Sequence, residues 1–255
     1  FGILSMGSTS DKSFLPYARQ NITQADIDAV VEVLRSDWLT QGPTIERFES
    51  ALAEVVGARC AVACANGTAA LHLAMLALRL GPGDIAVTTP NTFVADANCG
   101  RYVGADVRFV DIDPGTGNMS PDSLASALAD DTGKRIKAVV VVHFAGQPAD
   151  MLRISQLARA HGAFVVEDAC HALGARYDAD GTEIRVGSCR HSDLTVFSFH
   201  PVKHVATGEG GALSTNSPEL ETRLKLYRSH GIARDNFECR EMALDPIGTT
   251  NLWYY

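Results

Sequence analysis

The chain has 255 residues, of which 46% are hydrophobic and 20% charged, and its formal net charge is −8. This length and composition suffice for one large α/β domain or two small ones with a sizeable core. The acidic balance argues against nucleic acid and anionic membranes as main partners, because both favour a basic surface. The sequence contains no hydrophobic run of the length that a membrane span needs.

Two features of the sequence favour a cytoplasmic location. Residues 1–13 are polar and lack the basic start and apolar stretch of a signal peptide, so we expect an N-terminal extension or non-native residues outside the fold. The cysteines lack paired metal-ligand spacing, which favours free thiols in a reducing compartment. They are Cys60, Cys64, Cys99, Cys170, Cys189 and Cys239.

Helical and strand-like segments alternate along the chain, with short turns between them. Thr23 and Asp26 have the pattern of a helix N-cap, and Gly57 has that of a helix end. We expect helices at 23–35, 44–56, 68–80, 93–103, from 120 onward, 150–161 and 217–229. We expect strands at 60–65, 85–89, 107–112, 136–144, 163–167, 194–199 and 211–215.

This alternation predicts an α/β fold in which helices cover a mostly parallel sheet. The run 136–144 is nearly all apolar, as expected for a strand buried on both faces. After Arg234 the alternation is lost, and the chain stops at the aromatic-rich 251–255. We expect either that the chain was cut or has further residues that are not seen, or that this is a natural irregular tail.

Ligands of open α/β sheets bind beyond the carboxyl ends of the strands. The first candidate is 65–68, which leaves a strand and opens a helix, so that its N–H groups and the helix dipole could hold a phosphate. Gly67 allows close backbone approach, and Thr68 adds a hydroxyl group. Many helices start with such residues, so this segment alone is weak evidence.

The second candidate is 167–171, directly after an apolar strand. The carboxylate of Asp168 could face a buried cationic ring nitrogen and stabilise its protonated form. Asp168 could equally be a helix cap, and His171 could be a structural histidine.

The third candidate is 197–211, with the sequence FSFHPVKHVATGEGG. Lys203 lies there in a loop before a glycine-rich turn, where a lysine held in a pocket can act as an amine nucleophile. Most single lysines are instead solvated surface groups. His200 and His204 have helical spacing but no evident third ligand, so no metal site is expected. The glycines of 208–211 match neither a dinucleotide-binding nor a P-loop motif.

Taken together, these segments resemble the DegT/DnrJ/EryC1/StrS family of sugar aminotransferases, which use pyridoxal phosphate (PLP). The resemblance implies a PLP-dependent transferase of fold type I, with its large domain at 14–255 and its smaller C-terminal domain missing. The matching segments, between Tyr17 and Gly231, are SDWLTQGP, ANGTAALHLA, GPGD, TPNTFVADAN, VEDACHALGA, FSFHPVKH and GEGGALSTN.

The resemblance also implies roles for residues at matching positions. Lys203 would form the Schiff base with PLP, Asp168 would pair with the pyridine nitrogen, and His171 would lie near the ring oxygen. The other cofactor contacts that it implies are Gly67, Thr68 and Ser198 at the phosphate and Phe93 stacked on the ring.

Within the family, PYARQNI and SDWLTQGP are most similar to enzymes that aminate UDP-linked 4-keto-6-deoxy-N-acetylhexosamines on the way to pseudaminic acid. This similarity implies a nucleotide-sugar substrate, glutamate as amino donor and a homodimer with active sites between subunits. Trp38 and Leu39 could equally pack the helix connection. The substrate contacts implied are Tyr17, Asp37, Trp38, Leu39 and Thr40.

Two alternative functions remain open. Because the family's C-terminal domain would follow Tyr255, the chain could be an inactive fragment or a PLP-fold protein with a binding or regulatory role. It could also be another fold-type-I PLP enzyme, such as a carbon–sulfur lyase, although the TFVA and SFH segments favour the sugar family. Some relatives carry histidine in place of this lysine and dehydrate their substrate. The presence of Lys203 argues against a dehydratase.

Overall fold

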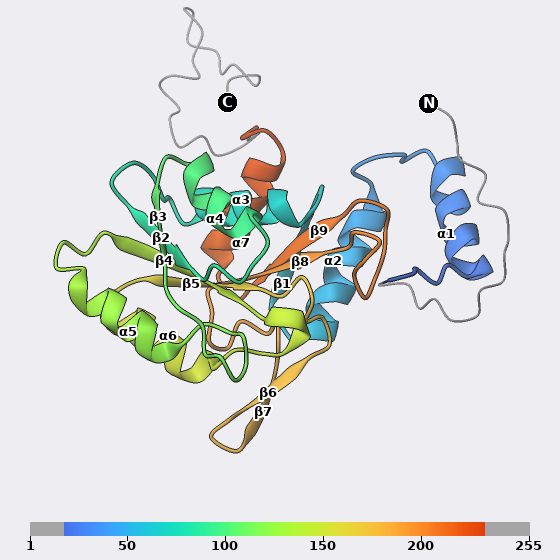
Figure 1. The fold of residues 1–255 in the computed structure, drawn as a ribbon. Coiled ribbons are helices and arrows are strands. Elements are labelled where there is room, and N and C mark those ends of the chain that lie inside the picture. Colours follow the sequence, from blue (N-terminus) through green and yellow to red (C-terminus); the bar gives the residue numbers. More distant parts are fainter. Residues whose placement is uncertain (1–17, 233–255) are drawn as a thin grey trace, which may run out of the picture.

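The protein is built around a seven-stranded sheet with helices on both faces (Figure 1). A computed structural model describes residues 18–232, so Tyr17, Cys239 and the segment after Arg234 lie outside the described residues. The spatial order of the strands is β3-β2-β4-β5-β8-β9-β1. The strands are β1 (Cys60–Cys64), β2 (Ile85–Thr88), β3 (Asp106–Phe109), β4 (Ile136–Val142), β5 (Phe164–Asp168), β8 (Leu194–Ser198) and β9 (Gly211–Thr215).

The predicted, mostly parallel sheet is confirmed. Strand β9 runs antiparallel to both of its neighbours, β8 and β1, whereas the other neighbouring strands pair in parallel. Strands β1 and β8 therefore point the same way as β2, β4 and β5. This common direction brings the carboxyl ends of strands that are distant in sequence to one edge of the sheet.

Local sequence signals set the ends of several helices. Thr23 and Asp26 form a reciprocal capping box, with the Thr23 N–H donating to Asp26 Oδ2 over 2.7 Å, and Gly57 ends the second helix with a left-handed φ of 77°. The helices are α1 (Gln24–Arg35), α2 (Pro43–Val56), α3 (Gly67–Ala77), α4 (Ala95–Tyr102), α5 (Pro121–Asp130), α6 (Met151–His161), α7 (Pro218–Arg228) and the short 3-10 helix η1 (Phe144–Gly146).

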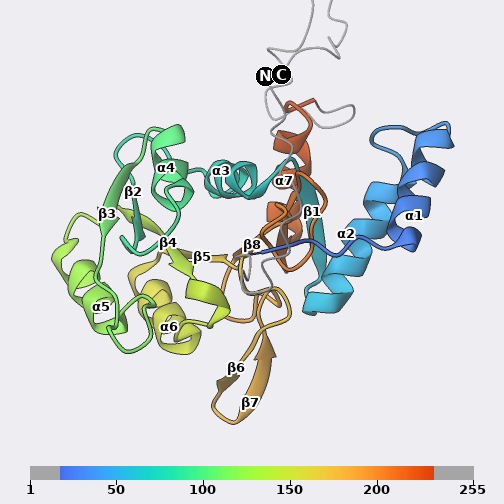
Figure 2. The ribbon, with the colours of Figure 1, turned by 45° about the vertical axis from the view of Figure 1, so that its right-hand side comes forward.

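The helices form one layer on each face of the sheet (Figure 2). Helices α3, α4 and α7 cover one face, and α2, α5 and α6 cover the other. Successive residues of a strand point to opposite faces. In β4, accordingly, Ala138 and Val140 join the cluster under α3, whereas Val139 and Val141 pack against α5 and α6.

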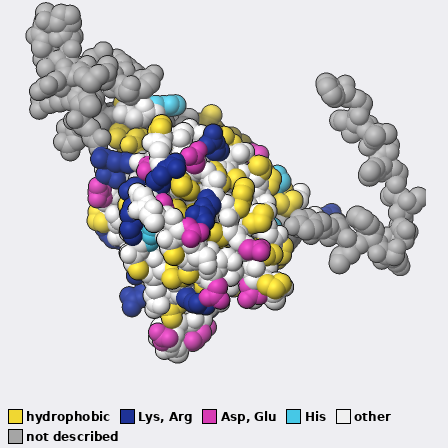
Figure 3. All heavy atoms as spheres, turned by 60° about the vertical axis from the view of Figure 1, so that its left-hand side comes forward, with side chains coloured by type: hydrophobic (Ala, Val, Ile, Leu, Met, Phe, Trp, Pro, Cys, Tyr) yellow, Lys and Arg dark blue, Asp and Glu magenta, His cyan; other side chains and the backbone are white. Residues whose placement is uncertain are grey.

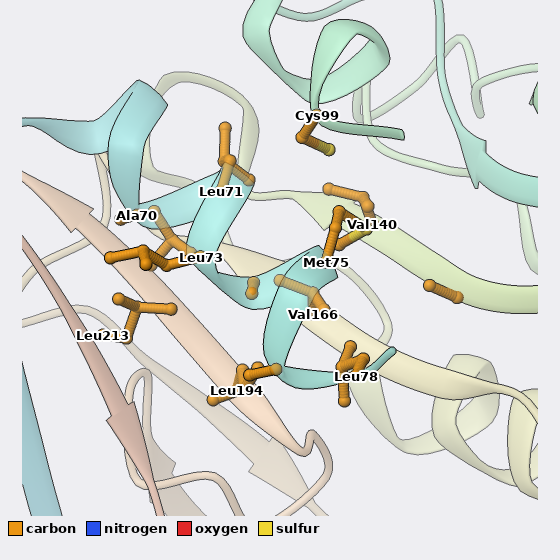
Figure 4. Close-up of a cluster of buried hydrophobic side chains, with 14 of the residues drawn as sticks. Ala70, Leu71, Leu73, Met75, Leu78, Cys99, Val140, Val166, Leu194 and Leu213 are labelled. Carbon is orange, nitrogen blue, oxygen red and sulfur yellow. The ribbon is translucent and has the colours of Figure 1, made fainter. Parts of the chain in front are cut away.

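Helix α3 lies across the centre of its face and is apolar on most sides, as a helix inside a protein core must be. Figure 4 shows Met75 and Leu78 beside Val140, Val166 and Leu194 of the sheet. This packing fixes the position of the whole helix, including its N-terminus at Gly67, relative to the strand ends.

The structure corrects several predicted element boundaries. The strands end one to three residues earlier than expected at 65, 89, 112, 144 and 199, and the helix predicted from Phe93 begins at Ala95. Phe93 therefore lies in the loop before α4 rather than inside it. A turn at 144–146 ends β4, because Gly146 adopts a left-handed φ of 87°.

A hairpin of β6 (Arg176–Ala179) and β7 (Thr182–Arg185) was not predicted. Its strands are short and charged, so they lack the alternation that marks a half-buried strand. Asp180 and Gly181 join them with φ values of 52° and 78°. An Asp-Gly pair with positive φ at both residues is a strong hairpin-turn signal, so this pair could have revealed the hairpin.

The surface has no dominant charge on the face drawn in Figure 3, where basic side chains lie among acidic and hydrophobic ones. The exposed ion pairs of the described residues include Arg135 with Asp106 at 2.8 Å and Arg108 with Asp130 at 3.3 Å. Within residues 18–232, no helix has both the length and the apolar character to cross a membrane.

The core around α3 predicts a stability difference between two identical substitutions. Leu71 is 2% exposed and Leu34, on α1, is 62% exposed. Leu71→Ala should lower the free energy of unfolding by about 2–5 kcal/mol, because it leaves a cavity. Leu34→Ala should change it by less than about 0.5 kcal/mol. Chemical denaturation of both variants measures the difference, and equal losses would contradict the burial of Leu71.

Candidate functional site

The three segments singled out in the sequence meet at the carboxyl edge of the sheet (Figure 1). The phosphate-type turn follows β1, the aspartate ends β5, and the lysine loop follows β8. A fourth segment, 89–94, follows β2 at the same edge. This is the edge at which open α/β sheets bind their ligands.

The start of α3 and the end of β8 form a narrow backbone cradle. A Cβ atom placed on Gly67 would lie 3.0 Å from Ser198 Cβ and 3.4 Å from Ser198 Oγ. Strand β9 places the start of α3 beside the end of β8. Its first residue, Gly211, pairs with Cys64 on one side and with Ser198 on the other. A Cβ on Gly211 would lie 2.3 Å from the carbonyl of Asn66, so only glycine fits.

This cradle has the chemistry of an anion site. Asn66 caps the helix by accepting the N–H of Ala69 over 2.9 Å. The first N–H groups of a helix have no intrahelical acceptor, so those of Gly67 and Thr68 can donate to an anion at the positive end of the helix dipole. The Ser198 hydroxyl adds a further possible donor.

Asp168 is a buried carboxylate at the last position of β5, with 7% exposure. Its Oδ1 accepts the N–H of Cys170 over 2.9 Å, and its carbonyl oxygen accepts the N–H of His143 over 3.1 Å. The residues after it form turns, so Asp168 supports a turn and is not the helix cap considered above. The carboxylate has further lone pairs with which it can also bind a cationic partner.

Lys203 lies in the turn after β8, held by a hydrogen bond from its N–H to the carbonyl oxygen of His200 over 2.8 Å. Its charge acts on the other groups of the site. Burial, and then the positive charge of Lys203, lower the pKa of His171. His171 is therefore a neutral imidazole near pH 7, able to donate or accept a hydrogen bond.

Phe93 lies in the segment after β2 and is 71% exposed, so its ring is open to a ligand. The turn that carries it is closed by Asp96, whose N–H donates to the Phe93 carbonyl oxygen over 3.2 Å. Asp96 is fully buried, and the charges of both Asp168 and Lys203 reach it. We did not predict Asp96 as a site residue, because an aspartate in the first helical turn is ordinarily a favourable but unremarkable choice.

The predicted substrate segment, 37–40, lies in the connection between α1 and α2. Trp38 is 61% exposed and Leu39 65% exposed, although the Trp38 side chain also lies against Gly42 in the same connection. The hydrogen bonds of Trp38 are local, with its N–H donating to Ser36 Oγ over 3.2 Å. Asp37 and Thr40 are also exposed.

Neither metal binding nor disulfide bonding is found in the part of the chain that the structure describes. Between residues 18 and 232, no three or more metal-binding side chains lie together. His200 and His204 therefore belong to no such group. The five cysteines in that range are free thiols.

A buried polar network lies directly behind the site. Glu167 precedes Asp168 in β5 and so points to the opposite face of the sheet. It contacts His143 Nε2 over 2.8 Å and accepts hydrogen bonds from Ser192 and Thr195. Burial acts to raise the pKa of Glu167, but the hydrogen bonds, chiefly the one to His143, outweigh burial and lower it. The network ties β5 to β4 and β8 at the level of the site.

Comparison with known proteins identifies the family. The model of the DegT/DnrJ/EryC1/StrS aminotransferase family matches residues 20–249. The chain belongs to this family. The match includes all of the predicted cofactor contacts, which are Gly67, Thr68, Phe93, Asp168, His171, Ser198 and Lys203.

Relatives and a solved structure agree with this assignment. The chain is 41% identical over 242 residues to the spore coat polysaccharide biosynthesis protein SpsC of Bacillus subtilis, covering 95% of this chain and 58% of SpsC. It is 42% identical over 220 residues to the UDP-4-amino-4,6-dideoxy-N-acetyl-beta-L-altrosamine transaminase of Campylobacter jejuni serotype O:23/36, covering 86% and 56%.

The structure superposes on PseC of Helicobacter pylori, an aminotransferase involved in the biosynthesis of pseudoaminic acid, with a TM-score of 0.76 and 33% identity. That match covers 88% of this chain and 58% of PseC. The chain thus spans less than two thirds of the length of these relatives. The fold is that of the fold-type-I sugar aminotransferases, whose cofactor is PLP.

The site fits this cofactor. The cradle at Gly67 and Ser198 offers backbone and hydroxyl donors to a phosphate, the buried carboxylate of Asp168 suits a cationic ring nitrogen, and Lys203 supplies a primary amine. These three groups are an anion site, a counter-ion and a nucleophile, the set that binding PLP requires.

Gly211 gives a direct test of the cradle. Gly211→Ala would place a methyl group against the Asn66 carbonyl and push the start of α3 away from Ser198. We expect it to destabilise the protein by about 1–3 kcal/mol and to weaken PLP binding measured by fluorescence titration. Gly81→Ala is the control, since a Cβ there meets nothing within 4 Å. Equal PLP binding by both variants would contradict this geometry.

Proposed function

We propose that the protein is the cofactor-binding part of a PLP-dependent aminotransferase that transfers an amino group from glutamate to C4 of a nucleotide-linked 4-keto-6-deoxy sugar, an N-acetylhexosamine linked to UDP. The observation that carries the proposal is the convergence of Gly67, Asp168 and Lys203 from three distant segments at one sheet edge. Family membership supports the reaction class.

Each residue of the edge has a proposed task in holding the cofactor. The N–H groups of Gly67 and Thr68 and the hydroxyl of Ser198 would hold the phosphate, and the Phe93 ring would contact the pyridine. Asp168 would pair with the ring nitrogen and favour its protonated form. When bound, PLP supplies an electron sink that stabilises negative charge on the carbon that loses a proton.

Lys203 moves protons as well as anchoring the cofactor. Its Nζ removes the proton from the α-carbon of the amino donor and, in the second half of the reaction, delivers a proton to C4 of the sugar. His171 is neutral because burial and the charge of Lys203 lower its pKa. A neutral imidazole can hydrogen-bond the ring oxygen without adding a second positive charge beside the lysine.

The substrate assignment rests on similarity and on exposure. The Campylobacter jejuni relative is named as a transaminase of a UDP-linked 4-amino-4,6-dideoxy sugar, and the Helicobacter pylori neighbour as an aminotransferase of pseudoaminic acid biosynthesis. We assign sugar contacts to Tyr17 and to residues 37–40, of which Trp38 offers an exposed aromatic surface to a sugar or base.

We also propose that the enzyme works as a homodimer in the cytoplasm. Apolar side chains around the site are exposed in the single chain, and clustered exposed apolar groups mark interaction surfaces. The free thiols suit a reducing compartment. The exposed side chains around the site include Phe93, Val94, Phe144, Val202 and Val205.

Lys203→Ala tests the central role of the lysine. The wild-type protein with PLP should show the visible absorbance of covalently bound cofactor, and the variant should lose both that absorbance and transamination, because alanine has no amine to attach the cofactor. Lys137→Ala, at an exposed position of β4, is the control and should retain both. Persistence of the absorbance in Lys203→Ala would refute the assigned role.

The substrate class is tested by product analysis. The full-length protein, incubated with PLP, glutamate and a UDP-linked 4-keto-6-deoxy-N-acetylhexosamine, should form the 4-amino sugar and 2-oxoglutarate in equal amounts, detected by mass spectrometry. A deoxythymidine-linked 4-keto sugar serves as comparison. Release of pyruvate or sulfide from a cysteine-type substrate, with no dependence on a ketosugar, would instead indicate a lyase.

A further inference from the structure

Asp96 is a fully buried carboxyl group at the site that none of the tasks above uses. It lies in the first turn of α4, with 0% exposure. Its Oδ2 accepts a hydrogen bond from the Thr92 hydroxyl. Its Oδ1 is buried and has no hydrogen-bond partner among the described residues. A buried carboxylate oxygen without a donor destabilises the fold, because burial removes water from the oxygen and no protein donor replaces it.

The neighbour that Asp96 faces is another carboxyl group, that of Asp168. The negative charge of Asp168 acts on Asp96, and the two side chains are close enough to share a hydrogen bond. Two carboxylate groups can form that bond only when one of them carries a proton. Ionising both of two adjacent buried carboxyl groups is unfavourable in free energy, because the two negative charges repel each other. We therefore expect the pair to hold one proton and one negative charge.

The surroundings indicate which of the two carries the proton. Asp168 already accepts the N–H of Cys170 over 2.9 Å and so has a donor of its own. Asp96 is the more buried of the two. Burial, and then the charge of Asp168, raise the pKa of Asp96 well above its usual range. A proton on Oδ1 of Asp96 also supplies the partner that this oxygen otherwise lacks.

The other ionisable groups around Asp96 leave this assignment intact. Lys203, from the loop after β8, acts to lower the pKa of Asp96, but less than burial and Asp168 raise it. Cys99 of the same helix is neutral, since burial raises its pKa to about 12. The Cys170 thiol is also neutral, because burial and Asp168 raise its pKa.

We propose that Asp96 is a neutral carboxylic acid that donates a hydrogen bond to Asp168 and thereby holds the Asp168 carboxylate, as the single negative charge of the pair, toward the pyridine nitrogen of PLP. Asp96 is thus a positioning residue that acts through Asp168. A hydrogen bond from Asp96 fixes the orientation of the Asp168 side chain. This inference rests on the proposed function, because it takes Asp168 as the partner of the cofactor.

Infrared spectroscopy of the full-length protein tests the protonation directly. At neutral pH the wild type should show the carbonyl band of a protonated carboxylic acid, and Asp96→Asn should lack it. Asp130→Asn is the control, because the Asp130 side chain is 72% exposed and should leave the band unchanged. Absence of the band from the wild type would overturn the proposal without any variant. Its persistence in Asp96→Asn would do the same.

The positioning role is tested by the dissociation constant for PLP. Asp96→Asn keeps a donor toward Asp168 and an acceptor for Thr92, so its dissociation constant should stay within about threefold of the wild type. Asp96→Leu removes the donor, and loss of a hydrogen bond to a charged group should weaken PLP binding about tenfold or more. The bound cofactor's absorbance should also change its pH dependence in Asp96→Leu.

Thr92→Val separates this role from a purely structural one. It removes the Thr92 hydroxyl from Asp96 Oδ2 and leaves the contact with Asp168, so PLP binding should stay within about threefold of the wild type. Equal weakening in Thr92→Val and Asp96→Leu would show that Asp96 only closes the turn. Failure of the wild type to bind PLP would refute the proposed function, whereas the infrared band would still report the carboxyl pair.

Discussion

One buried negative charge, that of Asp168, governs the arrangement of this edge of the sheet. Removing a carboxylate from water is unfavourable unless hydrogen bonds and opposite charges compensate. The Cys170 N–H supplies one such bond, and the positive charge of Lys203 acts on the same group of residues. A cationic ring nitrogen would complete the compensation. The buried carboxylate of Asp168 thus suits a cationic group of the cofactor. In the pair of carboxyl groups, Asp96 carries the proton.

The second constraint is the antiparallel strand β9, which lies between β1 and β8. Its first residue, Gly211, pairs with the last residues of both neighbours. The cradle between the start of α3 and Ser198 exists because this glycine has no side chain. The packing of α3 against the sheet then fixes the helix N-terminus, and the network of Glu167 fixes β5 beside it. The packing of the core therefore also sets the positions of the groups in the site.

Sequence reasoning found the alternation of elements and the three segments that meet at the edge, because strands buried on both faces and helix caps leave strong local patterns. It missed the β6–β7 hairpin, whose strands lack alternation, and placed Phe93 inside a helix that begins at Ala95. It also missed Asp96, since nothing in the sequence indicates that this aspartate meets Asp168 across two elements. Such contacts depend on the tertiary structure.

The central claim is that Lys203 is the amine to which PLP is attached. Reduction of the full-length protein with borohydride in the presence of PLP, followed by proteolysis and mass spectrometry, locates the attachment. The account predicts a cofactor adduct on the peptide that contains Lys203 and on no other lysine peptide. An adduct on a different lysine, or no adduct on protein that binds PLP, would contradict it.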